Sequence, residues 1–273
     1  MTRLDRRALF TSGAAAALLA ATGLRPEAQP KAGGRLRLAL AREDGALAAV
    51  ARSAMFDTLT EVAPNGTLRG ELSSSWSSDA TARHWTFQLR DDAVFHDQTV
   101  FGAPDAVRVL GAHPAFERAR ITARDHTTVA IDLTDPDPQL PMLLSDIRFA
   151  MTHSQDTMIG TGLYQQQRFD PDRHFLGARV AQHYKDGQAG WFDSIDAIVI
   201  PDSGVRAEAL RDGFVDVAQL PKLEGLPGRG GFVFHPSVDD VALVAQITVG
   251  VPAHIGTRAP LDDGRIGERW WMA

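Results

Sequence analysis

Apolar and polar residues alternate with a period of two in several short segments of this 273-residue sequence. The clearest segment is 84–90, which reads His-Trp-Thr-Phe-Gln-Leu-Arg, and the same spacing recurs in 36–40 and 129–133. This period places successive side chains on opposite faces of a β-strand, so that one face packs on a core. Two longer apolar runs, 195–200 and 241–249, are typical of more deeply buried strands. The sequence therefore predicts a strand-rich fold.

Helical signals are fewer than strand signals. Pro104 and Asp105 mark a helix start, because proline suits the first turn and an acidic residue suits the positive end of the helix dipole. Asp202 can cap a second helix that runs to Arg211 and is closed by Gly213. Strands and helices are mixed without a regular βαβ rhythm or an internal repeat, which predicts a mixed α/β (α+β) fold.

Composition restricts the class of protein further. A hydrophobic content of 44% with 23% charged residues is ordinary for a globular protein. The chain has 28 basic and 34 acidic residues, a net charge of −6, which argues against a nucleic-acid partner. It has no cysteine, which excludes disulfides, thiolate metal sites and a cysteine nucleophile.

The first 33 residues differ in composition from the rest and are interpreted as a cleaved export signal. Arg3, Arg6 and Arg7 precede an alanine-rich apolar run over 8–24, which is short and weakly hydrophobic for a membrane span. The Arg6-Arg7 pair resembles a twin-arginine signal, although Asp5 stands where Ser or Thr is usual. Without residues 1–33 the chain has 23 basic and 32 acidic residues, so we expect no membrane insertion after cleavage.

A search for catalytic motifs finds no convincing constellation. No serine has the Gly-x-Ser-x-Gly setting, and 160–162 (Gly-Thr-Gly) lacks the third glycine of a dinucleotide loop because Gln165 stands there. The nine histidines show no pair spaced for a metal, and His96 and Asp97 would point to opposite faces of a strand. We therefore expect no enzyme activity, no catalytic residue, no protein metal site and no cofactor.

From Leu68 onward, successive blocks resemble the family 5 extracytoplasmic solute-binding proteins, which serve ABC importers of peptides and nickel. The blocks that carry the resemblance are 68–76, 84–97, 105–107, 159–164, 183–187 with 192–195, 200–216 and 259–266. The stretches 89–97, 113–119 and 143–154 are more similar to the nickel-type branch than to the longer peptide binders.

The resemblance implies the first lobe of a periplasmic binding protein of type II, with a side subdomain. We expect the signal in 1–33, the main lobe in 34–62 and 160–273, and the side subdomain in 63–159. Two lobes normally close over the ligand in this family. The sequence stops where the second lobe would begin, so the resemblance implies that most of this lobe is missing.

Four residues are expected to contact a ligand on the basis of the resemblance: Arg42, Glu43, Phe116 and Arg148. The loop that holds Arg42 and Glu43 follows the first strand and is shortened. Phe116 and Arg148 lie near positions where the nickel-type branch has an aromatic residue and an arginine facing the cleft. For Arg148 a structural salt bridge is an alternative, and the sequence favours it.

The resulting hypothesis is a periplasmic solute-binding component of an ABC importer. Its ligand would be a small peptide or a nickel chelate, and its partner an ABC permease in the inner membrane. Whether transport function is retained or degenerate stays open. The alternative is a single-lobe protein-interaction module without transport function, which the apolar end Trp270-Trp271-Met272 would suit if it were exposed.

Overall fold

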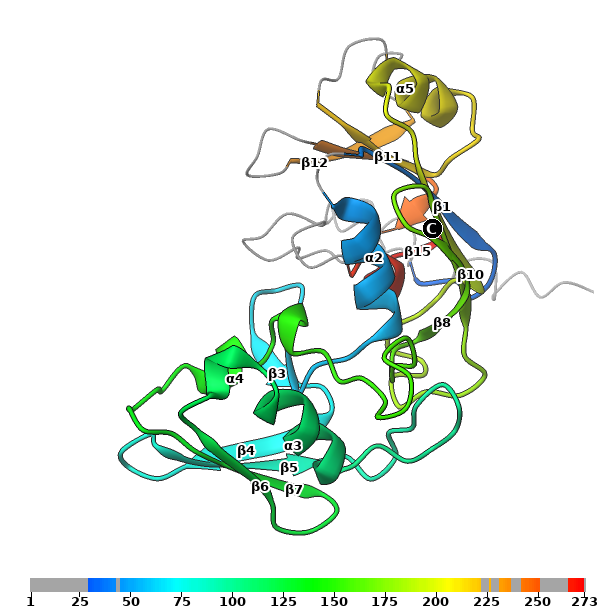
Figure 1. Ribbon diagram of the computed structural model, residues 1–273. Helices are drawn as coiled ribbons and strands as arrows, with labels where there is room; N and C mark the ends of the chain where they lie inside the picture. The colour runs from blue at the N-terminus through cyan, green and yellow to red at the C-terminus, as the bar shows by residue number, and fades with distance from the viewer. Residues whose placement is uncertain are drawn as a thin grey trace, which may run out of the picture.

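The computed structural model describes residues 29–42, 45–221, 226, 231–236, 242–250 and 265–272. Its larger part, here called the main unit, is built on a seven-stranded mixed sheet (Figure 1). The strands are β1 (Arg35–Leu40), β8 (Tyr164–Asp170), β9 (His174–Arg179), β10 (Ser194–Val199), β11 (Val217–Leu220), β12 (Phe232–Pro236) and β13 (Ala242–Gln246). Their order in the sheet is β12-β13-β11-β1-β10-β9-β8.

Strand β1 lies in the middle of this sheet and is parallel to both of its neighbours, β10 and β11. The outer pairs β10–β9, β9–β8, β11–β13 and β13–β12 are antiparallel. In sequence order, β10 is added beside one edge of β1, and β11 is then added beside its other edge. The strand order reverses at β1, and such a switch point is where open α/β sheets bind ligands.

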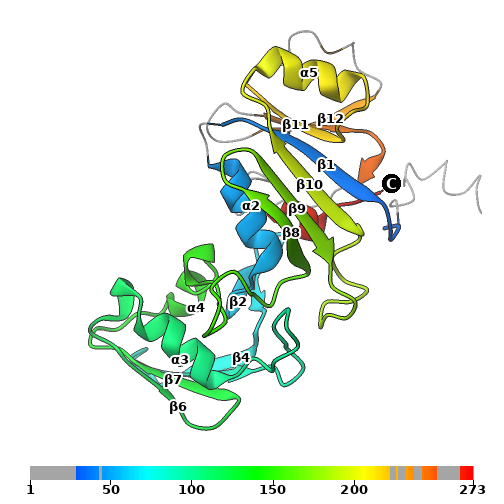
Figure 2. The same cartoon turned by 45° about the vertical axis from the view of Figure 1, so that its right-hand side comes forward.

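Helices α2 (Ala46–Met55) and α5 (Ser203–Arg211) pack on opposite faces of the sheet (Figure 2). Leu36, Leu38 and Leu40 share a hydrophobic core with α2, whereas Ala39 packs with Leu210 of α5. The predicted alternation of β1 is confirmed, because Leu36, Leu38 and Leu40 are buried. On the other face, Arg35 is exposed, Arg37 is partly buried and Ala39 is buried.

A second body, here called the side unit, contains a four-stranded antiparallel sheet of order β4-β5-β7-β6 (Figure 1). Its elements are β4 (Ser73–Ser78), β5 (His84–Leu89), α3 (Ala103–Gly111), the 3₁₀ turn η1 (Pro114–Phe116), β6 (Arg120–Ala123), β7 (Thr128–Asp132), α4 (Leu140–Leu143) and the 3₁₀ turn η2 (Ile147–Phe149). Trp85, Phe87 and Leu89 are buried in its core, as the alternation in 84–90 predicts. The side unit has a hydrophobic core separate from that of the main unit.

Both predicted helix starts are confirmed. The backbone N–H of Gly102 donates to the Asp105 carboxylate at 3.1 Å, and Pro104 lies in the first turn of α3. The Asp202 carboxylate accepts from the backbone N–H of Val205 at 2.9 Å and caps α5. These caps satisfy amide groups that have no partner within the helix.

The two units are joined by a hairpin of β2 (Thr60–Val62) and β3 (Leu68–Gly70) and by the segment that precedes β8. In that segment, Gly160 and Gly162 pass directly against the end of α2. A Cβ atom at Gly162 would lie 2.5 Å from the Met55 carbonyl carbon, and one at Gly160 would lie 2.0 Å from the Met55 oxygen. Only glycine allows this approach, in which the Gly162 N–H donates to the Met55 oxygen at 2.9 Å.

Two expectations from the sequence are wrong. Strand β10 is not buried throughout, because Ile198 is 41% exposed and the strand alternates between buried and open positions. The apolar end that the interaction-module alternative requires to be exposed is packed instead. Trp270 is 2% exposed in the main core between α6 (Ile266–Arg269) and β15 (Trp271–Met272), and β15 pairs with β14 (Val249–Gly250).

Candidate functional site

The four residues expected to contact a ligand lie in different surroundings. Arg42 is exposed at the end of β1, and Glu43 lies outside the described residues. Phe116 is 3% exposed, and its ring packs edge-on against Phe149 at 5.6 Å between centroids, so it faces the core of the side unit. Arg148 is exposed and pairs with Asp146 at 3.0 Å, which is the structural use favoured above.

The structure brings Phe116 and Arg148 near each other, because η1 and η2 lie side by side through Phe149. The backbone oxygen of Ile147, in η2, accepts from Arg52 Nε of α2 at 3.1 Å. Arg42 precedes the same helix, but it lines a pocket with residues of β8, β9, β10 and the β8–β9 turn, and with none of η1 or η2 among the described residues. Only part of the expected set therefore comes together.

Arg42 lines a pocket of about 410 Å³ at the edge of the main sheet. The pocket is formed by the turn between β8 and β9 and by Ile198 and Val199 at the end of β10. It lies where the parallel strands β1 and β10 end, which is the edge that the sheet topology marks for ligands. The pocket is open to solvent on one side, and Ile198 in its lining is 41% exposed.

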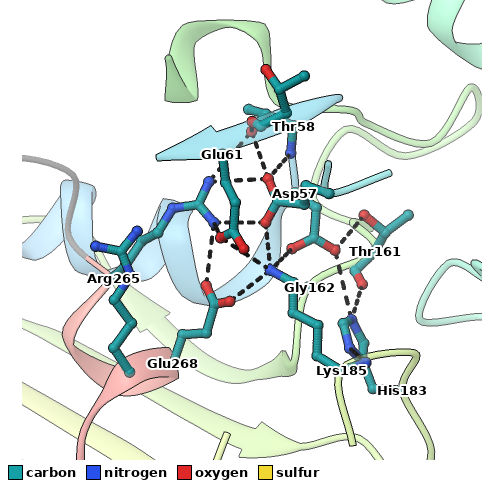
Figure 3. Close-up of polar contacts among 12 residues, drawn as sticks. Asp57, Thr58, Glu61, Thr161, Gly162, His183, Lys185, Arg265 and Glu268 are labelled. Atoms are coloured by element: carbon teal, nitrogen blue, oxygen red, sulfur yellow. Dashed lines mark hydrogen bonds and ion pairs between the residues drawn. The ribbon is translucent and has the colours of Figure 1, made fainter. Parts of the chain in front are cut away.

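A buried ion network joins the two units (Figure 3). Its charged or titratable members come from the chain around β2 and β3, from the loop after β9, and from α6. They are Asp57, Glu61, Glu71, His183, Lys185, Arg265 and Glu268. Each side chain is at most 8% exposed. Buried charges require partners, and the network supplies them within itself.

Lys185 holds the centre of the network. Its Nζ donates to Glu71 Oε1 at 2.5 Å and to Glu268 Oε1 at 2.6 Å. It also lies 3.5 Å from Glu61 Oε2 and 3.8 Å from Asp57 Oδ1. One ammonium group thus faces four carboxylates.

Arg265 is the second buried cation. Its NH1 donates to Glu61 Oε2 at 2.7 Å and to Glu71 Oε1 at 2.6 Å, and its NH2 donates to Glu71 Oε2 at 3.1 Å. The pairing with Glu71 is bidentate, the strongest form of arginine–carboxylate contact. At the edge of the network, Arg69 Nε donates to Glu61 Oε1 at 2.5 Å. Three cations therefore face four carboxylates.

Asp57 and His183 form the other end of the network. Thr161 Oγ1 donates to Asp57 Oδ2 at 3.0 Å, and His183 Nε2 donates to the Thr161 backbone oxygen at 2.8 Å. The Lys185 backbone N–H donates to His183 Nδ1 at 3.1 Å, so both ring nitrogens of His183 are engaged. The Gly-Thr-Gly segment is thus a structural link, not a phosphate-binding loop.

The network shifts the pKa values of its members in opposite directions. Burial disfavours the charged form of Asp57, but Lys185 and His183 outweigh burial and hold its pKa far below the usual range. Burial likewise disfavours the Lys185 ammonium, yet Glu268, Glu61 and Glu71 raise its pKa well above the usual value. Both groups are therefore charged at neutral pH.

Three carboxylates of the network, from Glu61, Glu71 and Glu268, each offer an oxygen within 4.8 Å of the others. Such a set could hold a divalent cation. The Lys185 ammonium and the Arg265 guanidinium already donate to the same oxygens, so the charge that a metal would neutralise is compensated by the protein. The arrangement fixes the two units together.

The network was not predicted from the sequence. A signal was nevertheless present, because Glu71, Lys185 and Arg265 belong to three of the blocks that carry the family resemblance. Their partners could not be identified, since 194 residues separate Glu71 from Arg265.

No helix in the described part of the chain is long and apolar enough to cross a membrane. Solved structures of periplasmic binding proteins resemble this one, and they define the class of fold. The DppA protein of Helicobacter pylori, an ABC transporter-associated periplasmic binding protein solved with the peptide STSA, has a TM-score of 0.67 at 20% identity. The match covers 76% of this chain and 51% of DppA. A nickel ABC transporter structure from Bacillus halodurans has a TM-score of 0.63 at 22% identity, with coverages of 75% and 50%.

Residues 67–229, more than half of the chain, match the family described as "Bacterial extracellular solute-binding proteins, family 5 Middle". The chain belongs to this family. A relative from Sinorhizobium fredii, named "Probable peptide ABC transporter periplasmic-binding protein y4tO", is 25% identical over 266 residues. That match covers 82% of this chain and 50% of the relative. The chain thus spans about half the length of the proteins that it resembles.

Proposed function

We propose that this chain is a periplasmic solute-binding component of an ABC importer for small peptides or nickel chelates. The observation that carries the proposal is the family match over residues 67–229. The fold supports it, because a pocket of about 410 Å³ lies where β1 and β10 end, beside the switch point of the sheet. In this role the protein binds and releases a ligand without catalysing a reaction, and its partner is an ABC permease of the inner membrane.

The division of the chain and its export are part of the proposal. Two sheets with separate hydrophobic cores support a main lobe in 34–62 and 160–273 and a side subdomain in 63–159. Residues 1–33 act as a twin-arginine signal in this proposal; 1–28 of them lie outside the described residues.

The ligand class is proposed from the relatives and from the open face. The names of the relatives include peptide and nickel transport proteins, and we propose the nickel-type branch on the sequence blocks given above. The open face is the pocket at the end of β1, where Arg42 is exposed. We propose that this pocket contributes to ligand binding.

A thermal-shift panel tests this function. Alanyl-alanine, trialanine and the nickel–histidine complex should each be titrated, with metal-free histidine and glucose as controls. A ligand at about 100 times its Kd stabilises the folded state by about 2.7 kcal/mol, which raises the Tm by roughly 5–10 °C for a chain of this size. The peptide and nickel arms separate the two ligand classes. No shift with any of the three ligands, in a sample with a folded circular-dichroism spectrum, contradicts the proposed function.

A further inference from the structure

Three arginines line the pocket at the end of β1: Arg42, Arg168 and Arg173. They come from two separate parts of the sheet. Arg42 follows the central strand β1, whereas Arg168 and Arg173 flank the turn between β8 and β9. The backbone N–H of Val199 donates to the Arg173 oxygen at 2.9 Å, which fixes this turn against the end of β10.

These arginines have little charge compensation from the described residues. Neither Arg42 nor Arg168 has a carboxylate within ion-pair distance there, and Arg173 Nε lies 3.9 Å from Asp170 Oδ2. Glu43 and Asp44, which follow Arg42, lie outside the described residues. Exposed ion pairs of this length contribute little to stability, so the Arg173 guanidinium remains available to another anion.

The other titratable groups of the pocket are Asp170, Asp172 and His174. His174 Nε2 is bonded to Asp196 Oδ1 at 2.7 Å, so its ring is already engaged. Among the described residues that line the pocket, three guanidinium groups thus stand against two carboxylates. This local excess of positive charge contrasts with the net charge of −6 of the chain.

Helix α2 adds to the positive potential at the same edge of the sheet. It begins at Ala46, four residues after Arg42, and its N-cap Gly45 supplies no side-chain hydrogen bond. Its first turn contains no acidic residue. The partial positive charge of the helix N-terminus is therefore not compensated by its own side chains.

We propose that this pocket binds the carboxylate group of the transported ligand through Arg42, Arg168 and Arg173. The inference rests on the proposed function and deepens it by naming the chemical group recognised. Guanidinium groups bind carboxylates through paired N–H donors, and a pocket of about 410 Å³ has room for the group and the atoms next to it. The carboxylate can belong to the C-terminus of a peptide or to an organic acid that chelates nickel.

The central comparison is between alanyl-alanine and its amide, which differ only in the C-terminal carboxylate. Binding of alanyl-alanine, its C-terminal amide and its N-acetyl derivative should be measured by calorimetry, with citrate and nickel–citrate as the chelator arm. The arginine Nε–H signals in ¹⁵N NMR spectra report the site directly. We expect the amide to bind about tenfold more weakly than the free dipeptide, as expected for the loss of a charge-assisted contact.

Arginine variants test whether these three residues cause the difference in binding between dipeptide and amide. Arg168→Gln with Arg173→Gln should remove most of the difference between dipeptide and amide, and Arg42→Gln should reduce it. Arg118→Gln is the matched control, because Arg118 is an exposed arginine of the side unit whose Asp135 partner lies 3.4 Å away. It should leave the difference unchanged.

The outcomes separate this inference from the proposed function. Equal binding of dipeptide and amide, or binding that the arginine variants do not change, overturns the carboxylate site while the solute-binding function stands. Shifts of the arginine signals with citrate, without stabilisation by any peptide or nickel ligand, support the site and contradict the proposed ligands. No binding and no signal shift with any carboxylate overturns both.

Discussion

Lys185→Met removes the ammonium group on which four buried carboxylates converge. In the wild type, Lys185 Nζ lies 2.5 Å from Glu71 and 2.6 Å from Glu268, with Glu61 at 3.5 Å and Asp57 at 3.8 Å. Methionine fills a similar volume but carries no charge. Breaking a buried ion pair by removing one partner costs about 3–5 kcal/mol, because the remaining charge is left buried without compensation. We expect a loss in this range, which is a large part of the roughly 5–15 kcal/mol that stabilises an ordinary domain.

The loss of stability in the variant should depend on pH, although the wild-type contributions of Asp57 and Lys185 stay constant between pH 5 and pH 7. The lowered pKa of Asp57 contributes stability above its unfolded value of about 3.9, and this contribution is lost as pH falls. The raised pKa of Lys185 contributes stability below its unfolded value of about 10.4, and this contribution is lost as pH rises through the folded value. In the variant, a carboxylate can take up a proton in place of the missing ammonium. The difference from wild type should therefore shrink between pH 7 and pH 5.

Urea unfolding at both pH values, followed by tryptophan fluorescence, measures the effect. Arg118→Met serves as the control, because its pair with Asp135 is exposed and should contribute at most about 1 kcal/mol. Adding Glu71→Gln to Lys185→Met should cost less than the sum of the two single changes, since both disturb the same network. A loss below about 1 kcal/mol for Lys185→Met, with no change between the pH values, would refute the reasoning.

Two further substitutions test close packing. Gly162→Ala would place a Cβ atom 2.5 Å from the backbone of Met55 and should cost about 1–3 kcal/mol of stability. Gly111→Ala, whose Cβ would have no atom within 4 Å, should be neutral or stabilising in thermal melts. Equal Tm values for the two variants would contradict this packing. Trp270→Ala should cost about 3–5 kcal/mol in urea unfolding because the ring is 2% exposed; an unchanged midpoint would restore the exposed-interface interpretation.

Much of the local structure could be predicted from the sequence, because it depends on neighbouring residues. The alternation in 84–90 identifies β5 and its buried face, and Asp105 and Asp202 identify two helix starts by their caps. The exposure of Ile198 could not be predicted in this way. An apolar run is typical of burial on both faces, whereas the packing of β10 in the sheet leaves one of its positions partly open.

The ion network could not be predicted, for a different reason. Charged residues are usually solvated, and nothing near Glu71 or Lys185 in the sequence shows that each is buried against the other. Trp270 presents the same difficulty, since its burial depends on a core assembled from distant strands. Arg42 was found through the family resemblance, whereas Arg168 and Arg173 became candidates only when the sheet placed them beside it.

The long separation between the two halves of the ion network sets an order of events in folding. Arg265 follows Glu71 by 194 residues, and at a synthesis rate of about 5–20 residues per second this interval lasts roughly 10–40 s. During that time the carboxylates of Glu61 and Glu71 lack one of their two buried cations and are more stable in water than in a closed interior. We therefore expect the joint between the units to exclude water only after Arg265 and α6 have docked on it.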